Sequence, residues 1–179
     1  MFEEYLEDSY ELFQMAQYAV KENDYRTASR FYRASVFYAF SALEAFVNYI
    51  ATSFALAGNL ENCEIAFLSD IRQDFSNTKF KLIDKVEYHK LEDKLKFLIT
   101  RFESTYNFNN SLWSGLLEFK KFRDLLVHPK QDTNNVTIEE YRLKLCTGIT
   151  SVIGIMDVIS VAIFNKHLRK KIFPDLIPK

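Results

Sequence analysis

The stretch that decides the fold is "ASVFYAFSALEAFVNYIA", residues 34–51. Apolar side chains fill nearly every position in it, and Glu44 is its single charged residue. A helix that is apolar nearly all round belongs in the middle of a bundle, where other helices cover it. We therefore predict a central helix over residues 25–57, with Asp24 as its N-cap and Gly58 as its stop signal.

Segments on both sides of this helix repeat apolar residues at spacings of three and four, which is typical of amphipathic helices. Asn110 or Ser111 is suited to capping one of them, and Thr137 begins a capping-box pattern in front of the last. No segment favours a strand. The sequence thus predicts an all-α bundle of five or six helices, two of them over 30 residues, in one domain spanning residues 1–179. The predicted helices cover residues 2–21, 25–57, 60–75, 86–102, 112–128 and 138–172.

Composition limits the possible functions. The formal net charge is −1, so no whole-protein field attracts nucleic acid, and any such contact needs a local basic patch. Cys63 and Cys146 are isolated in the sequence, which favours reduced core thiols over a disulfide or a metal site. His89 and His167 have no companions at ligand spacing, and there is no glycine-rich phosphate loop. We predict neither a metal nor a cofactor.

One apolar stretch, "CTGITSVIGIMDVISVAIF" at residues 146–164, has the length of a membrane span. Asp157 lies near its centre, and a charge at bilayer depth is costly, so we predict a buried core helix there instead. The opening residues, "MFEEYLEDSYELF", carry acids where a signal peptide carries lysines. We therefore expect a cytoplasmic protein without membrane contact.

The chemistry concentrates in "KKFRDLLVHPK", residues 120–130. A proline disfavours helical geometry in the residue before it, so His128 should end the helix. Asp124 lies one turn earlier on the same face, and Arg123 is rotated about 140° from His128. Arginine binds phosphate, histidine transfers protons and an acid can orient both, a set suited to phosphodiester chemistry. The alternative is an ordinary helix end in front of a proline.

The segment "FRDLLVHP", following a polar loop in an all-α chain, resembles the HEPN (higher eukaryotes and prokaryotes nucleotide-binding) domains. Their signature is Arg, usually followed by Asn, Asp or His, and then His after four to six intervening residues. Arg123, Asp124 and His128 occupy those places. The aromatic-rich helix "YRASVFYAFSALEAFVNYIA", residues 32–51, is also similar to that family.

The resemblance implies a metal-independent endoribonuclease, often a toxin or defence effector, that acts as a homodimer. His128 would then serve as acid or base at the ribose 2′-hydroxyl and the leaving group. Arg123 would bind the phosphate, and Asp124 would orient its neighbours. Because the chain has one copy of the motif, a site built from two copies requires a homodimer. An antitoxin or operon partner protein is a further expectation. Members paired with a nucleotidyltransferase antitoxin often carry a tyrosine where this chain has Lys130.

Other charged residues allow two interpretations each. Glu44 either holds Arg123 or His128 in place from a facing helix, or points to solvent. Several basic residues either contact RNA phosphates or form solvated helix faces. These candidates are Lys120, Lys121, Lys130, Arg30 and Arg33. The alternative to a ribonuclease is a non-catalytic helical module that binds nucleotide, RNA or a partner protein.

Overall fold

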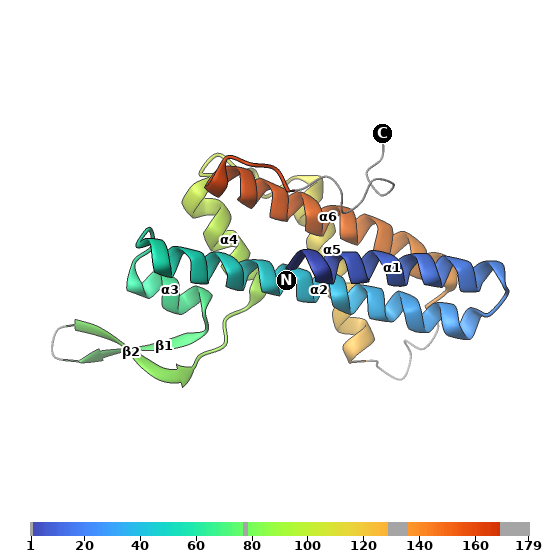
Figure 1. Ribbon diagram of the computed structural model, residues 1–179, viewed down its shortest axis with the longest axis horizontal. Coiled ribbons are helices and arrows are strands. Elements are labelled where there is room, and N and C mark those ends of the chain that lie inside the picture. The colour runs from blue at the N-terminus through green and yellow to red at the C-terminus, as the bar shows by residue number, and fades with distance from the viewer. Residues whose placement is uncertain (1, 77–78, 129–135, 169–179) are drawn as a thin grey trace. The chain divides into compact units, whose positions relative to one another are not determined.

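A computed structural model describes residues 2–76, 79–128 and 136–168 of the chain (Figure 1). Within these residues it contains six helices and one β-hairpin, which confirms the predicted all-α class. The helices are α1 (Phe2–Lys21), α2 (Tyr25–Ala57), α3 (Asn62–Leu68), α4 (Leu91–Phe102), α5 (Ser111–Val127) and α6 (Ile138–Phe164). The strands are β1 (Ile71–Ser76) and β2 (Lys79–Val86).

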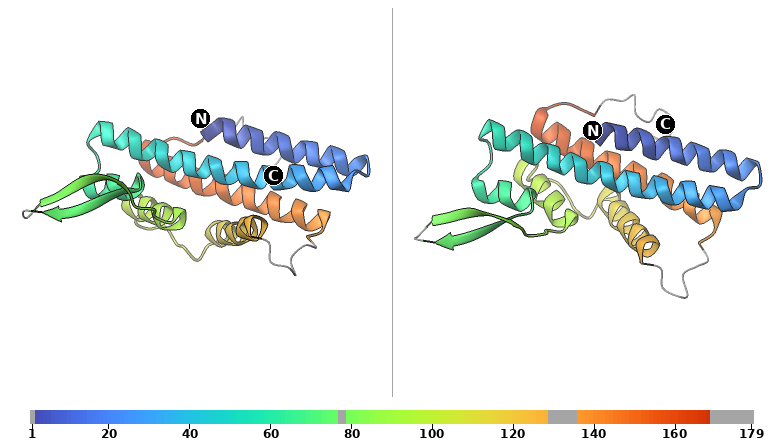
Figure 2. Two further views of the ribbon diagram at one scale, coloured as in Figure 1. Left: turned by 90° about the horizontal axis from the view of Figure 1, so that it is seen from below. Right: turned by 60° about the horizontal axis from the view of Figure 1, so that its bottom comes forward.

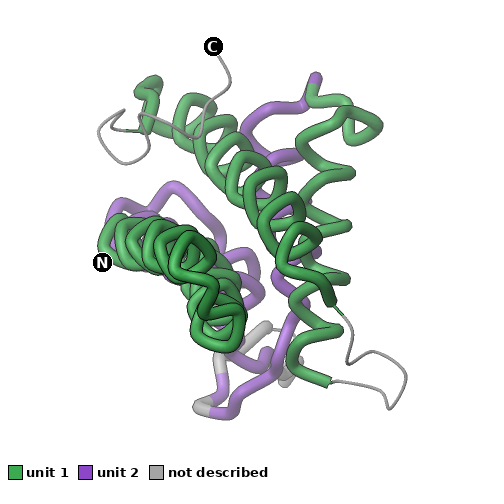
Figure 3. The backbone as a smooth tube through the Cα atoms, turned by 90° about the vertical axis from the view of Figure 1, so that its right-hand side faces the viewer, with its two compact units in different colours: residues 1–43, 106–179 green, residues 44–105 purple. Residues whose placement is uncertain are grey.

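The backbone forms two compact units, which Figure 3 shows in different colours. Unit 1 consists of residues 1–43 and 106–179, and unit 2 consists of residues 44–105. The prediction of one domain over residues 1–179 stays a prediction. The long helix α2 contributes its first part to unit 1 and its remainder to unit 2.

In unit 1, α1 and the start of α2 lie side by side in all views (Figures 1 and 2). Two fully buried serines meet between them. The Ser9 hydroxyl donates to the Ser35 carbonyl oxygen at 2.9 Å, and the Ser35 hydroxyl donates to the Ser9 carbonyl oxygen at 2.6 Å. Each small side chain therefore satisfies its own hydroxyl on the other helix, which buried polar groups require.

Helices α5 and α6 also pack closely in unit 1, because glycines lie at their contact. Gly148 on α6 faces the Phe119 ring on α5, and a methyl group at Gly148 would overlap that ring. Aromatic rings extend this core. Tyr32 of α2 stacks on Tyr141 of α6 at 6.0 Å between centroids, and Phe122 of α5 meets Tyr141 edge-on at 5.6 Å.

In unit 2, strand β1 occupies residues 71–75, for which we predicted helix, and β2 extends to Val86, where we predicted that the next helix begins. The prediction that no segment forms a strand is wrong here, as is the predicted helix over residues 60–75. The α3 helix ends at Leu68, and Asp70 takes a positive φ of 56°, a left-handed conformation that turns the chain out of the helix. The strands pair antiparallel, with Phe75 opposite Phe80.

The C-terminal helix ends earlier than predicted. We expected it to continue to about Ile172, but α6 stops at Phe164 because Asn165 takes a left-handed φ of 52°. The Asp157 carboxylate then accepts the Leu168 N–H at 2.8 Å and contacts His167 Nδ1 at 2.8 Å. These bonds fold the chain back onto α6. Only α2, at 33 residues, exceeds 30 among the described helices.

Three predicted N-caps are confirmed. Asp24 accepts the Thr27 N–H at 3.0 Å, Asn110 accepts the Trp113 N–H at 2.8 Å, and Thr137 accepts the Glu140 N–H at 3.2 Å. The stop signal after α2 is also confirmed, because Gly58 has a positive φ of 69°. Capping residues therefore fix where these helices begin and end.

By length and composition, both α2 and α6 are apolar enough to cross a membrane. Their most apolar windows have mean hydropathies of 1.3 and 1.9. Core helices of soluble proteins pass the same test, and about half of each window is buried inside this structure.

Candidate functional site

The motif with Arg123, Asp124 and His128 lies at the C-terminal end of α5, in unit 1. His128 is the C-cap residue, and its N–H donates to the Asp124 carbonyl oxygen at 2.9 Å. Its side chain is exposed and makes no hydrogen bond to another described residue. The prediction that the helix ends at His128 is confirmed, and its imidazole is accessible for proton transfer.

The Arg123 side chain is held from two directions. Its guanidinium carbon lies 5.7 Å from the centroid of the Phe40 ring on α2. Its Nη1 donates to Asp124 Oδ1 at 3.0 Å, and 36% of the side chain remains exposed. Phe40 is itself buried and stacks on Phe119 at 5.1 Å, so the ring beneath the guanidinium is fixed by the core. The arginine is thus positioned without being fully covered.

The Nε of Arg123 is buried and has no acceptor among the described residues. An unmade hydrogen bond at a buried donor is uncommon in native structures, and a catalytic role or a bound water or ion is among its explanations. Among the described residues, Asp124 is the only hydrogen-bond acceptor for the guanidinium N–H groups. Such groups can donate to the oxygens of a phosphate.

Asp124 interacts with cations on both sides. In addition to Arg123, it contacts Lys120 Nζ at 3.4 Å, one turn earlier on α5. Its carboxylate is thus a bonding partner of Arg123, and the role that we predicted for Asp124 in the reaction stays a prediction. No bond from this carboxylate reaches His128 among the described residues. The arrangement presents an oriented cation and an exposed imidazole at the C-terminal end of one helix.

Further basic side chains lie in the same unit. Lys121 pairs with Glu118 at 2.7 Å, and this hydrogen bond lowers the pKa of Glu118 below its ordinary value. Arg30 and Arg33 are exposed on α2. Burial raises the pKa of Tyr141, and the charge of Arg33 partly opposes that rise, so Arg33 lies within electrostatic range of α6. Lys130 is outside the described residues.

Glu44, the predicted supporting residue, is exposed and belongs to unit 2, whereas Arg123 and His128 belong to unit 1. The described bonds of Arg123 are with groups of its own unit, Asp124 and Phe40. The role of Glu44 towards the motif stays a prediction. Within unit 2, Glu44 instead lines a pocket of about 240 Å³.

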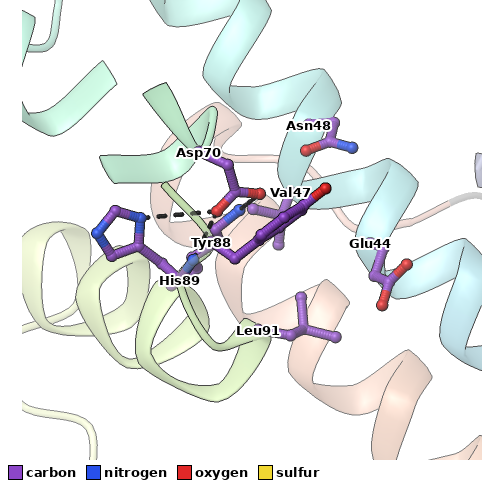
Figure 4. Close-up of a pocket in the computed structure, with 8 residues that line it drawn as sticks. Glu44, Val47, Asn48, Asp70, Tyr88, His89 and Leu91 are labelled. Atoms are coloured by element: carbon purple, nitrogen blue, oxygen red, sulfur yellow. Dashed lines mark hydrogen bonds and ion pairs between the residues drawn. The ribbon is translucent and has the colours of Figure 1, made fainter. Parts of the chain in front are cut away.

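Figure 4 shows this pocket of unit 2, which lies between α2, α4 and the segments next to the hairpin. Lys94 is buried there, with a side chain only 6% exposed, and its Nζ donates to Asp70 Oδ2 at 2.6 Å. The backbone N–H of His89 donates to the other carboxylate oxygen, Asp70 Oδ1, at 2.8 Å. The lining residues are Glu44, Val47, Asn48, Asp70, Tyr88, His89, Leu91 and Lys94.

The charges around Asp70 determine its protonation. Partial burial by itself raises the pKa of Asp70, but the hydrogen bonds from Lys94 and His89, with their charges, lower it below its ordinary value overall. The His89 ring rests on Phe67 at 4.6 Å between centroids. Sequence reasoning missed this cluster, because Asp70 and Lys94 are 24 residues apart and lie in no recognisable motif.

The two thiols are free, and they differ in exposure. Cys63 is exposed, so our prediction that it belongs to the core is wrong. Cys146 is partly buried, and burial raises the pKa of its thiol. Among the residues that the structure describes, no group of three or more His, Cys, Asp or Glu side chains is arranged to hold a metal ion.

Comparison of the chain with protein-family models, curated proteins and solved structures gives no match. A functional assignment therefore depends on the residues of the chain itself.

Proposed function

We propose that the protein is a metal-independent endoribonuclease of the HEPN type, located in the cytoplasm and acting as a homodimer in the role of a toxin or defence effector. The observation that carries this proposal is the orientation and exposure of the Arg123 and His128 side chains at the end of α5. The guanidinium is oriented by Asp124 and Phe40 but partly exposed, and the imidazole five residues later is exposed. A phosphate binder and a proton-transfer group thus share one helix end.

In the proposed reaction, Arg123 donates hydrogen bonds to the scissile phosphate and stabilises the charge that develops on its oxygens. His128 removes the proton from the ribose 2′-hydroxyl, and the 2′-oxygen then attacks the adjacent phosphorus. The bond to the 5′-oxygen breaks, and that oxygen takes up a proton from an imidazolium. A cyclic phosphate and a free 5′-hydroxyl result. The motif of the second protomer supplies the other proton-transfer group.

Substrate RNA would follow the basic side chains of unit 1. Lys120, Arg30 and Arg33 carry the positive charge for phosphate contacts, and such contacts weaken as salt rises. Since the net charge of the whole chain is −1, these local charges must supply the attraction. Binding should therefore decline steeply between low and moderate ionic strength.

The test is cleavage of mixed RNA in EDTA by the purified protein. We expect Arg123→Ala and His128→Ala to lose cleavage by a factor of about 100 or more, the scale of an acid–base or oxyanion contribution. Matched controls are Arg142→Ala and His167→Ala, which remove the same residue types from exposed positions outside the motif. Both controls should cleave at the wild-type rate.

Two results would count against the enzyme. Cleavage that survives in both motif variants would place the activity elsewhere. A wild-type protein that binds RNA or nucleotide without cleaving RNA would instead be the non-catalytic helical module. Light scattering of the purified protein tests the homodimer separately, since a monomer with full activity would exclude a site shared by two motifs.

A further inference from the structure

The pocket of unit 2 contains polar groups of two kinds, those that bond to one another and those that do not, and the buried His89 Nδ1 has no hydrogen-bond partner among the described residues. Asp70, Lys94 and His89 form a clamp. Asp70 Oδ2 accepts from Lys94, its Oδ1 accepts the His89 N–H, and its carbonyl oxygen accepts the Glu87 N–H at 2.8 Å. The carboxylate and the ammonium neutralise each other at 2.6 Å. This clamp holds the pocket wall together and offers little to a ligand.

The other polar groups keep their bonding capacity. Glu44 and Asn48 are exposed on α2, one turn apart, and neither side chain bonds to another described residue. In Figure 4, Glu44 and Asn48 extend from α2, the Tyr88 ring reaches towards that helix across the middle of the pocket, and Leu91 lies on the opposite side of the ring from Asn48. Tyr88 is 87% exposed, so much of its ring is accessible to a ligand. Val47 adds a buried apolar surface at the base.

Charge decides which ligand this arrangement suits. Because Asp70 and Lys94 cancel, the uncompensated charge of the pocket is the negative one on Glu44. An anion would meet repulsion there, whereas a cation gains both the carboxylate and the face of the Tyr88 ring. Size sets a second limit, since about 240 Å³ is less than the roughly 300–1,000 Å³ of pockets for drug-sized ligands.

We propose that this pocket binds a small organic cation, an amine with a short aromatic or aliphatic body. The ammonium group lies beside Glu44 and donates to its carboxylate and to the Asn48 side-chain oxygen. The apolar body packs between the Tyr88 ring and Leu91, above Val47. This site is independent of RNA cleavage, because all its residues belong to unit 2 and none belongs to the motif on α5.

The probes are three molecules of similar shape that differ in charge: 2-phenylethylamine, 2-phenylethanol and 3-phenylpropionate. Each is titrated into the full-length ¹⁵N-labelled protein at pH 7 while amide signals are followed by NMR. We expect the amine to shift the signals of Glu44, Asn48 and Tyr88. It should bind about fivefold more tightly than the alcohol, given one partly solvated ion pair and one cation–π contact. The propionate should bind least.

Variants locate the effect. Glu44→Gln keeps the shape of the side chain and should abolish the preference for the amine over the alcohol. The matched control is Asp93→Asn, which removes one negative charge from an exposed position on α4 outside the pocket and should leave the preference unchanged. Equal affinities for amine and alcohol, signals that shift outside the pocket, or an unchanged preference in Glu44→Gln would each overturn the proposal.

Discussion

Replacing Asp70 by asparagine removes one charge from the clamp of unit 2 and leaves the backbone undisturbed. Asparagine, like aspartate, tolerates the left-handed conformation, so the φ of 56° costs little extra strain. What changes is the environment of Lys94. Its ammonium is buried, with 6% of the side chain exposed, and it loses the carboxylate at 2.6 Å.

The expected loss follows from these exposures. Breaking a fully buried ion pair costs about 3–5 kcal/mol, because the remaining charge is left without compensation. The Asp70 side chain is 26% exposed, and asparagine keeps one accepting oxygen. Solvent and that oxygen reduce the penalty, so we expect a decrease in the free energy of unfolding of about 2–3 kcal/mol. Urea denaturation followed by circular dichroism measures it at pH 7.

The pH dependence has a definite sign. Because the folded state lowers the pKa of Asp70, its contribution to stability is fully present above about pH 5 and is lost as the pH falls through 4 and below the folded pKa. The difference in the free energy of unfolding between the wild type and Asp70→Asn should therefore become smaller in acid.

A second substitution tests the cause. Adding Lys94→Met to Asp70→Asn removes the stranded ammonium and keeps the chain length, so the double variant should recover at least half of the loss. The reasoning fails if Asp70→Asn stays within 0.5 kcal/mol of the wild type, a change typical of ordinary surface substitutions. It also fails if Lys94→Met brings no recovery.

Two further predictions concern the packing of unit 1, and the first uses Gly58 of unit 2 as its comparison. Gly148→Ala forces a methyl group into the Phe119 ring, so the free energy of unfolding should fall by about 1–3 kcal/mol. Gly58→Ala, with open space around the new methyl group but a positive φ, should lower it by only about 1 kcal/mol. Equal melting temperatures of Gly148→Ala and the wild type would contradict the close packing of α5 and α6. Ser35→Ala should lower the free energy of unfolding by about 1–2 kcal/mol, because the buried Ser9 loses the Ser35 hydroxyl as a hydrogen-bond partner. In a double-mutant cycle, the loss in Ser9→Ala/Ser35→Ala should be smaller than the sum of the losses in the two single variants.

Local signals in the sequence predicted much of the fold. Helical spacing located the elements of unit 1, and the capping residues Asp24, Asn110 and Thr137 set their starts. Such signals act within a few residues, so one sequence contains them in full. Pro129 after His128 likewise predicted the end of α5.

The hairpin and the end of α6 depended on less local effects. Residues 71–86 alternate apolar and charged side chains over parts of their length, but no Asn-Gly or Asp-Gly turn marks the hairpin, and the apolar residues of 60–75 also suit a helix. The end of α6 depends on Asp157 reaching Leu168, 11 residues away. A single sequence does not reveal such a contact.

The candidate site was predictable only in part. The motif on α5 could be located from its spacing and its family resemblance, but Phe40 beneath Arg123 could not, since the two residues are 83 positions apart. The Asp70–Lys94 pair carries no sequence signal beyond a lysine at helical spacing from Leu91 and Leu98 on α4. Tertiary pairs of this kind require the backbone before they can be seen.

The two buried serines between α1 and α2 affect how these helices are aligned along their axes. An interface of apolar side chains alone tolerates sliding, because one contact replaces another at little cost. Each serine here is matched to the main chain of the other at a single point, and a shift by one residue along the helix would strand two hydroxyls in a dry interior. Ser9 and Ser35 thus favour the observed alignment of α1 and α2 over alignments shifted along the helix axis.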